Sequence, residues 1–189
     1  MIKNFFTFLL ELVKIVVISL VIIIPVRQFL IQPFYVKGAS MEPNFHDHEY
    51  LIIDELSYHL GVPKRGDIIV FRYPKDPQEF FIKRVIGLPG ETVRIADGSV
   101  YIINEKNPQG VKLEEPYLPD GLKTYGYSDD ETTELKSNEY FVLGDNRGSS
   151  KDGRSFGPVN ESFLVGRVLL RGFPFDKIKL FNKGEAYNL

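Results

Sequence analysis

The chain has 189 residues and a formal net charge of −2, a size that suits one sizeable domain with an additional segment. It contains no cysteine, which excludes disulfides, thiolate zinc sites and cysteine nucleophiles. No basic patch of the kind that binds nucleic acid stands out, so we expect no nucleic-acid partner.

The first feature along the chain is an apolar segment, residues 5–30. As a helix it would be about 39 Å long, whereas the hydrocarbon core of a bilayer is about 30 Å thick. We therefore predict an N-terminal segment, residues 1–33, that contains a single transmembrane helix at about residues 8–30. The alternative is a cleaved signal peptide, but no small-x-small pair closely follows the apolar run. Lys3 and Arg27 lie on opposite flanks, so charge indicates the orientation only weakly.

After Pro33, short β-type runs dominate, and residues 34–189 are predicted to form a mostly β domain. Asp97-Gly98 marks a hairpin turn, and a short helix is expected near residues 54–60. Residues 105–138 are polar and turn-rich, and we interpret them as an insert outside the core. The predicted strands fall within residues 50–56, 66–73, 80–90, 92–103, 139–147 and 163–173.

Ser40 lies in the stretch VKGASMEPNF, between Gly38-Ala39 and Met41-Glu42-Pro43. This serine could be a nucleophile, a turn residue or a helix cap. A nucleophilic serine needs a general base, which could be a lysine or a histidine. His46 and His48 could instead bind a metal together, but no further ligands follow at a familiar spacing.

Lys83 stands in an apolar strand pattern, where alternation places Phe81, Lys83 and Val85 on one face. One interpretation is an edge strand whose cations reach into solvent. The other is a buried lysine that stays neutral and acts as a base. The second interpretation requires its pKa to fall by about 2 units or more from the ordinary value near 10.4.

The segment GDNRGSSKDGR, residues 144–154, directly follows an apolar strand. Its alternating acids and bases predict a fixed ion-pair network, which would contain Asp145, Arg147, Asp152 and Arg154. A calcium loop is the weaker alternative, because the EF-hand spacing and the closing glutamate are missing.

Together with the apolar segment, the motifs GASMEP, RGDIIVF, FIKRVIGLPGE and LGDNRGSSKDGRSFGPV resemble bacterial type I signal peptidases. These are membrane-anchored serine/lysine proteases, and the motifs follow in the family's order along nearly the whole chain. The resemblance implies a β domain of antiparallel sheets with an inserted polar subdomain, preceded by one transmembrane helix. It also implies a catalytic domain outside the cytoplasm, at the plasma membrane.

By this resemblance, Ser40 is the nucleophile and Lys83 the general base, while Ser150 orients the lysine. The Ser40 backbone N–H would bind the oxyanion. Some relatives add a hydroxyl where this chain has Gly38, so a second donor would have to be backbone or water. The acidic and basic residues of 144–154 fall on structural ion-pair positions. The small substrate pockets would be lined by Val36, Met41, Phe81 and Ile82.

The implied activity is cleavage of signal peptides from exported preproteins after a small-x-small site, without a metal or organic cofactor. The expected partners are therefore preproteins and the lipid bilayer. One rival is a self-cleaving Ser-Lys protease, which would need a DNA-binding module. Another is an inactive, membrane-tethered β domain that only binds.

Overall fold

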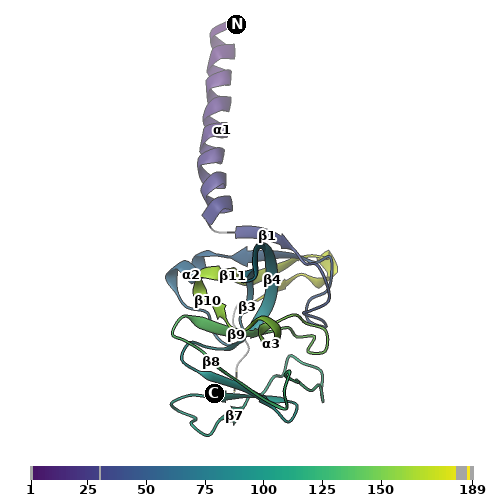
Figure 1. The fold of residues 1–189 in the computed structure, drawn as a ribbon. Helices are drawn as coiled ribbons and strands as arrows, with labels where there is room; N and C mark the ends of the chain where they lie inside the picture. The colour runs from purple at the N-terminus through teal and green to yellow at the C-terminus, as the bar shows by residue number, and fades with distance from the viewer. Residues whose placement is uncertain (1, 30, 182–186, 188–189) are drawn as a thin grey trace.

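A long helix and a β domain make up the described part of the protein. The computed structural model describes residues 2–29, 31–181 and 187; some side chains within residues 2–32 and at residues 59–60 lie outside the described set. The helix α1 (Ile2–Phe29) projects from the β domain, and β1 (Ile31–Tyr35) begins at its foot (Figure 1). The β domain therefore begins inside the segment 1–33 that was assigned to the anchor.

The side chains described on α1 are exposed and mostly apolar, with Leu12 at 47% and Ile18 at 50%. Over the described residues, no helix combines the length and apolar character that crossing a membrane requires. The predicted span, about 8–30, includes Ile22 and residues 25–30, whose side chains lie outside the described set. The transmembrane helix is thus not confirmed and stays a prediction.

The β domain contains two antiparallel sheets in its described residues. The larger sheet has the order β1, β2 (Tyr50–Asp54), β11 (Leu164–Phe173), β3 (Ile68–Tyr73), β4 (Asp76–Gly87), β9 (Glu139–Leu143) and β10 (Val159–Asn160), with β12 (Lys179–Leu180) paired to β11. The smaller has the order β7 (Val111–Lys112), β6 (Ser99–Ile103), β5 (Thr92–Ala96) and β8 (Asp130–Glu134). The expected mostly β, antiparallel fold is confirmed.

Short helical turns connect these strands: α2 (Leu56–Leu60), α3 (Gly153–Phe156), η1 (Glu161–Phe163) and η2 (Phe175–Lys177). The predicted helix near 54–60 corresponds to α2. The hairpin β5–β6 turns at Asp97 and Gly98, which have φ angles of 53° and 73°. Positive φ at both positions is what a tight two-residue hairpin turn requires.

Residues 105–138 are part of a packed sheet. Their strands β7 and β8 flank the hairpin β5–β6, at the end of the domain far from α1 (Figure 1). Leu113 and Leu135 are each 3% exposed and belong to the same apolar cluster as Ile86 and Phe141 of the larger sheet. The expectation that this segment lies outside the core is therefore wrong: Leu113 and Leu135 pack into the apolar cluster that the two sheets share.

Candidate active site

Ser40 occupies a tight turn shortly after β1. Gly38 has φ +90°, a left-handed conformation that glycine adopts without strain. Its N–H donates a hydrogen bond to Asp47 Oδ1 at 2.9 Å. Met41 and Phe45, at 1% and 0% exposed, fix the far side of the turn in the core. Ser40 is half-buried and lines a cleft at the surface.

The base candidate Lys83 approaches Ser40 from β4. Its Nζ lies 2.8 Å from Ser40 Oγ and also donates to Ile82 O at 2.7 Å. β4 is paired on both sides, with β3 and β9, and Lys83 is only 3% exposed. The interpretation of an edge strand with solvent-reaching cations is therefore wrong for Lys83. The hydroxyl of Ser40 is paired with a lysine, as the serine/lysine hypothesis expects.

Burial changes the acidity of the Lys83 ammonium. In the β3–β4 register Lys83 lies opposite Ile69, and Phe81 lies opposite Phe71, so the lysine shares an apolar face. Desolvation on this face lowers the pKa of Lys83 to about 8, although the carboxylates of Asp152 and Asp145 act in the opposite direction. Burial therefore brings the loss of the Lys83 proton closer to neutral pH.

The segment that follows β9 packs directly against the Ser40 turn. A Cβ on Gly144 would overlap the Ser150 hydroxyl and the Ser40 carbonyl oxygen, so this close approach requires glycine. Asn146 N–H donates to Ser40 O at 3.1 Å. The Ser150 hydroxyl is buried and has no hydrogen-bond partner among the described residues, so its predicted bond to Lys83 is not formed here.

The ion pairs differ in part from those predicted. Asp152 and Arg154 do pair, with Nη2–Oδ2 at 2.8 Å. Asp145 instead forms a bidentate pair with Arg84, at 2.8 and 2.7 Å. Arg147 pairs with Glu115, with its Nη1 2.9 Å from Oε2. The predicted network therefore draws partners from β4 and from the segment 105–138, which the local charge pattern could not reveal.

Tyr117 and Asn44 connect this network to the Ser40 turn through contacts that the local sequence pattern does not predict. The Arg84 guanidinium lies 3.7 Å from the Tyr117 ring centre, while the Tyr117 hydroxyl accepts from Arg147 Nη2 at 3.2 Å. Asn44 Nδ2 donates to Tyr117 O and to Asp145 Oδ2, both at 2.9 Å. The only sequence signal was the position of Asn44 at the end of the serine motif.

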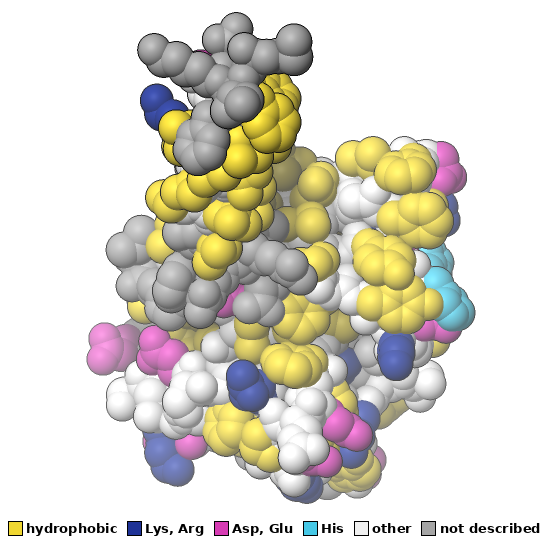
Figure 2. Space-filling model, turned by 90° about the horizontal axis from the view of Figure 1, so that it is seen from above, with side chains coloured by type: hydrophobic (Ala, Val, Ile, Leu, Met, Phe, Trp, Pro, Cys, Tyr) yellow, Lys and Arg dark blue, Asp and Glu magenta, His cyan; other side chains and the backbone are white. Residues whose placement is uncertain are grey.

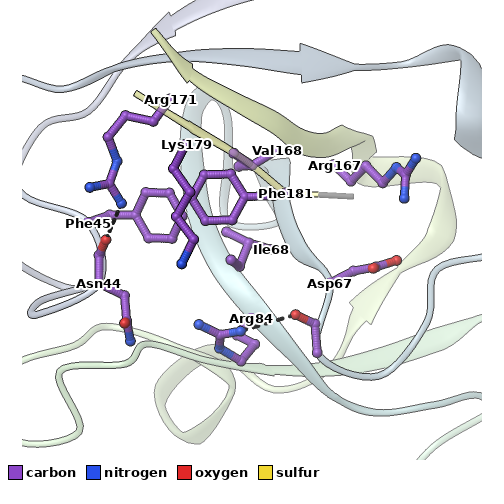
Figure 3. A pocket seen from close by; sticks show the side chains of 11 residues that line it. Asn44, Phe45, Asp67, Ile68, Arg84, Arg167, Val168, Arg171, Lys179 and Phe181 are labelled. Atoms are coloured by element: carbon purple, nitrogen blue, oxygen red, sulfur yellow. Dashed lines mark hydrogen bonds between the residues drawn. The ribbon is translucent and has the colours of Figure 1, made fainter. Parts of the chain in front are cut away.

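A small pocket lined by Asn44, Phe45 and Arg171 shows the contacts that hold the end of the Ser40 turn (Figure 3). Arg171 of β11 donates to Asn44 O at 2.6 Å, and its guanidinium lies 5.1 Å from the Phe45 ring centre. Arg171 Nε is also 3.0 Å from Glu49 Oε2, and both residues are buried. These contacts fix the backbone that follows the nucleophile candidate.

The cleft at the Ser40 hydroxyl has a volume of about 640 Å³ and opens toward β1 and the start of β4. Three of the predicted pocket residues line it: Val36, Phe81 and Ile82. Met41 does not line it; because its side chain is buried beneath the turn, that assignment is wrong. The remaining lining includes Phe34, Leu51 and Val70, so the floor is mostly apolar.

His46 and His48 each lie near a carboxylate of their own turn. His46 Nδ1 lies 3.6 Å from Glu42 Oε1, whereas His48 Nδ1 lies 3.2 Å from Asp47 Oδ2. In the part of the chain that the structure describes, no group of three potential metal ligands occurs.

The family is decided by comparison with known proteins. The model of the family "Signal peptidase, peptidase S26" matches residues 9–173. The chain belongs to this signal peptidase family. It is 35% identical to signal peptidase IB of Staphylococcus aureus strain MRSA252 over 95% of this chain and 98% of that protein.

Two further proteins are similar to this chain. A probable signal peptidase I-2 of a Synechocystis species is 36% identical over 90% of this chain and 76% of that protein. The crystal structure of a signal peptidase I from Enterococcus faecalis V583 is 38% identical and covers 56% of this chain and 96% of its own, with a TM-score of 0.46. The match to the family model and the similarity to the relatives from Staphylococcus aureus and Synechocystis confirm the predicted family and the predicted activity, a signal peptidase I serine endopeptidase.

Proposed function

We propose that this signal peptidase cleaves preproteins with Ser40 as nucleophile and Lys83 as general base. The observation that carries the proposal is the 2.8 Å contact between Ser40 Oγ and a Lys83 Nζ that is buried in an apolar face. Desolvation supplies the neutral amine that a base requires, and the contact supplies the path for the proton.

In the first step, Lys83 Nζ takes the Ser40 hydroxyl proton while Oγ forms a bond to the carbonyl carbon of the signal peptide's last residue. The carbonyl oxygen becomes an oxyanion. The Ser40 N–H has no partner among the described residues, so it is free to donate to this oxygen. The Gly38 N–H is already donated to Asp47, and Gly38 offers no hydroxyl.

Collapse of this intermediate breaks the carbon–nitrogen bond, and protonated Lys83 gives its proton to the leaving amine of the mature protein. The signal peptide stays esterified to Ser40. Lys83 then takes a proton from water, whose oxygen attacks the ester carbonyl. Ser40 leaves with the proton from Lys83, and the signal peptide is released with a free carboxylate. The steps require no metal or organic cofactor.

Ser150 is proposed to orient Lys83 during turnover. Its hydroxyl is buried without a described partner beside Gly144, so it can accept a hydrogen bond when Lys83 becomes protonated. The ion pairs Arg84–Asp145 and Arg154–Asp152 fix the loop that carries Ser150 against the Ser40 turn. Their role is mainly positional, although the carboxylates of Asp152 and Asp145 also favour the protonated form of Lys83 and raise its pKa against the effect of burial.

The cleft suits an apolar segment with small side chains near the reacting carbonyl. Phe81 and Ile82 of β4 and Val36, which directly follows β1, line the cleft together with Ser40, and the rings of Phe34, Phe80 and Phe81 restrict its space. We therefore propose cleavage after a small-x-small site, where side chains as small as alanine fit.

The position of the cleft also agrees with a membrane substrate. Phe29 ends α1, and Ser40 can be at most about 36 Å further along an extended chain, at ~3.3 Å per residue. An aromatic row of Tyr35, Tyr50, Phe173 and Phe175 is exposed near the foot of α1, and Figure 2 shows hydrophobic side chains gathered on this face. We propose that α1 anchors the protein in the plasma membrane as a single span. The catalytic domain then lies outside the cytoplasm, with the row against the lipid.

The test uses the full-length protein in detergent, a preprotein with an Ala-x-Ala site, and mass spectrometry of the products. Wild type should cut directly after the site, and Ser40→Ala and Lys83→Ala should each reduce the rate at least about a thousandfold. Circular dichroism controls for folding. Full activity of Lys83→Ala would refute the assigned base, and a folded wild type without any cut would favour a binding partner that has lost catalysis.

A further inference from the structure

Lys151 is a cation at the rim of the cleft that the proposed mechanism does not use. It lines the same cleft as Ser40 and Lys83, and its side chain is exposed. Among the described residues it has no hydrogen bond and no ion pair, so its charge is uncompensated.

The Lys151 ammonium is nevertheless held in place. It lies 4.2 Å from the Tyr73 ring centre and 5.7 Å from that of Phe81. These two rings stack on each other, with centres 4.5 Å apart and an interplanar angle of 8°. Phe156 packs on both rings edge-on, at 5.5 and 6.2 Å, which makes the platform rigid.

The backbone under Lys151 is equally fixed. Its neighbour Asp152 is fully buried, and this carboxylate accepts hydrogen bonds from Gly144 N–H at 3.0 Å and from the Arg154 guanidinium. On the other side, the Ser150 hydroxyl is buried. The Lys151 ammonium is therefore already held at the cleft. Binding an anion costs it little conformational entropy, so the contact is more favourable than one made by a mobile lysine.

A second lysine offers a contrast within the same cleft. Lys37 also lines it and is exposed, but no ring or hydrogen bond from the described residues holds its ammonium. One acidic residue, Glu79, lines the cleft, and among the described residues it forms no ion pair with either lysine. A substrate carboxylate could thus approach Lys151 without displacing a partner.

We propose that Lys151 is a specificity-determining residue that favours preproteins with an aspartate or glutamate near the scissile bond, at the position facing the Tyr73–Phe81 platform. This inference rests on the proposed function, because it assumes that the preprotein occupies the cleft at Ser40. Since the lysine is exposed at the rim, the preference is modest, about two- to fivefold, as for a surface ion pair.

The test measures kcat/KM for preproteins that carry Glu, Gln or Lys at single positions from five residues before to three residues after the cut. At one position, wild type should prefer Glu over Gln by about two- to fivefold, and raised salt should weaken this preference. Lys151→Arg should keep the preference, and Lys151→Ala should abolish it. Lys151→Glu should invert it, so that the Lys substrate becomes the better one, which a purely structural role would not produce.

Lys37→Glu is the matched control within the cleft, and it should leave the Glu preference at that position intact. The assignment would be overturned if the Glu-to-Gln ratio of kcat/KM were the same in wild type and Lys151→Glu. It would also be overturned if Lys37→Glu changed this ratio as much as Lys151→Glu does. The two proposals fail in different ways. If the proposed function is wrong, wild type cleaves none of the substrates. If only this inference is wrong, wild type cleaves the Glu, Gln and Lys substrates equally well.

Discussion

Lys83 combines two properties, almost complete burial and a side-chain nitrogen 2.8 Å from the Ser40 hydroxyl. Its pKa of about 8 results from desolvation against the pull of two carboxylates. A base works only in its unprotonated form, so the rate depends on the neutral fraction of this lysine.

We predict that kcat/KM rises about tenfold per pH unit below pH 8 and levels off above it, since Lys83 loses its proton in this range. Initial rates of preprotein cleavage between pH 5.5 and 9.5, at constant ionic strength, test this. An inflection near pH 6.5 would indicate a histidine base instead.

The burial of Lys83 also makes the free energy of unfolding depend on pH. The folded-state pKa of Lys83, about 8, is below its ordinary value of 10.5, so between these pH values the unfolded chain binds the proton and the folded chain does not. Stability therefore rises with pH across this window, and the cost of burying the charge, about 3 kcal/mol, is fully present below pH 8.

Lys83→Met should thus be inactive yet at least as stable as wild type at pH 7, with this advantage shrinking as pH rises from 8 to 10.5. Urea unfolding at pH 7 and pH 10 measures the difference. Equal destabilisation of the variant at both pH values would contradict the buried-charge account.

At the scale of elements, the site is a junction of segments distant in sequence. The Arg84–Asp145 bond joins residues 61 positions apart, and Asn44–Asp145 joins residues 101 apart. The segment 105–138 contributes Glu115 and Tyr117 to this junction, so it stabilises the site as well as the smaller sheet.

Tyr117→Ala should destabilise the protein by about 2–4 kcal/mol, because it removes the ring that covers the buried Arg84 guanidinium. Tyr117→Phe keeps the ring but loses two hydroxyl contacts, the bond accepted from Arg147 and the bond donated to Glu115 Oε1, so its cost should be smaller, about 1–2 kcal/mol. Tyr127→Ala, at a ring that is 78% exposed, is the matched control and should change stability by less than about 0.5 kcal/mol. Thermal unfolding ranks the three variants; an order other than this one would refute the role of Tyr117.

The sequence predicted these elements unevenly, for a physical reason. The alternation of residues along the strand around Lys83 is a local pattern. It was therefore possible to predict from the sequence that the lysine lies on an apolar face, where a charged ammonium is unfavourable. The hairpin turn at Asp97-Gly98 was predictable for the same reason. The partners of Asp145 and Arg147 depend on sheet order, which local charge alternation does not encode. Met41 was misplaced because adjacency to Ser40 in sequence says little about which side of a tight turn faces the cleft.

At the scale of the whole molecule, the exposed side chains of α1 and the aromatic row occur at the same end as the cleft. The proposed anchor therefore brings the reacting groups to the surface where a signal peptide ends.

We predict that the full-length protein stays in the membrane fraction after an alkaline carbonate wash and is released only by detergent. Protease added outside intact spheroplasts should digest the β domain, while a cytoplasmic marker survives. Release by carbonate alone would contradict a spanning α1, and protection of the β domain would contradict the proposed orientation.

The most direct test of the central claim is the identity of the acylated residue. Enzyme in excess over preprotein is quenched with acid at millisecond times, and intact and fragment masses are measured. The account predicts an adduct of the signal peptide's mass on Ser40 that does not form in Lys83→Ala. An adduct on another residue, or undiminished acylation of Ser40 in Lys83→Ala, would contradict it.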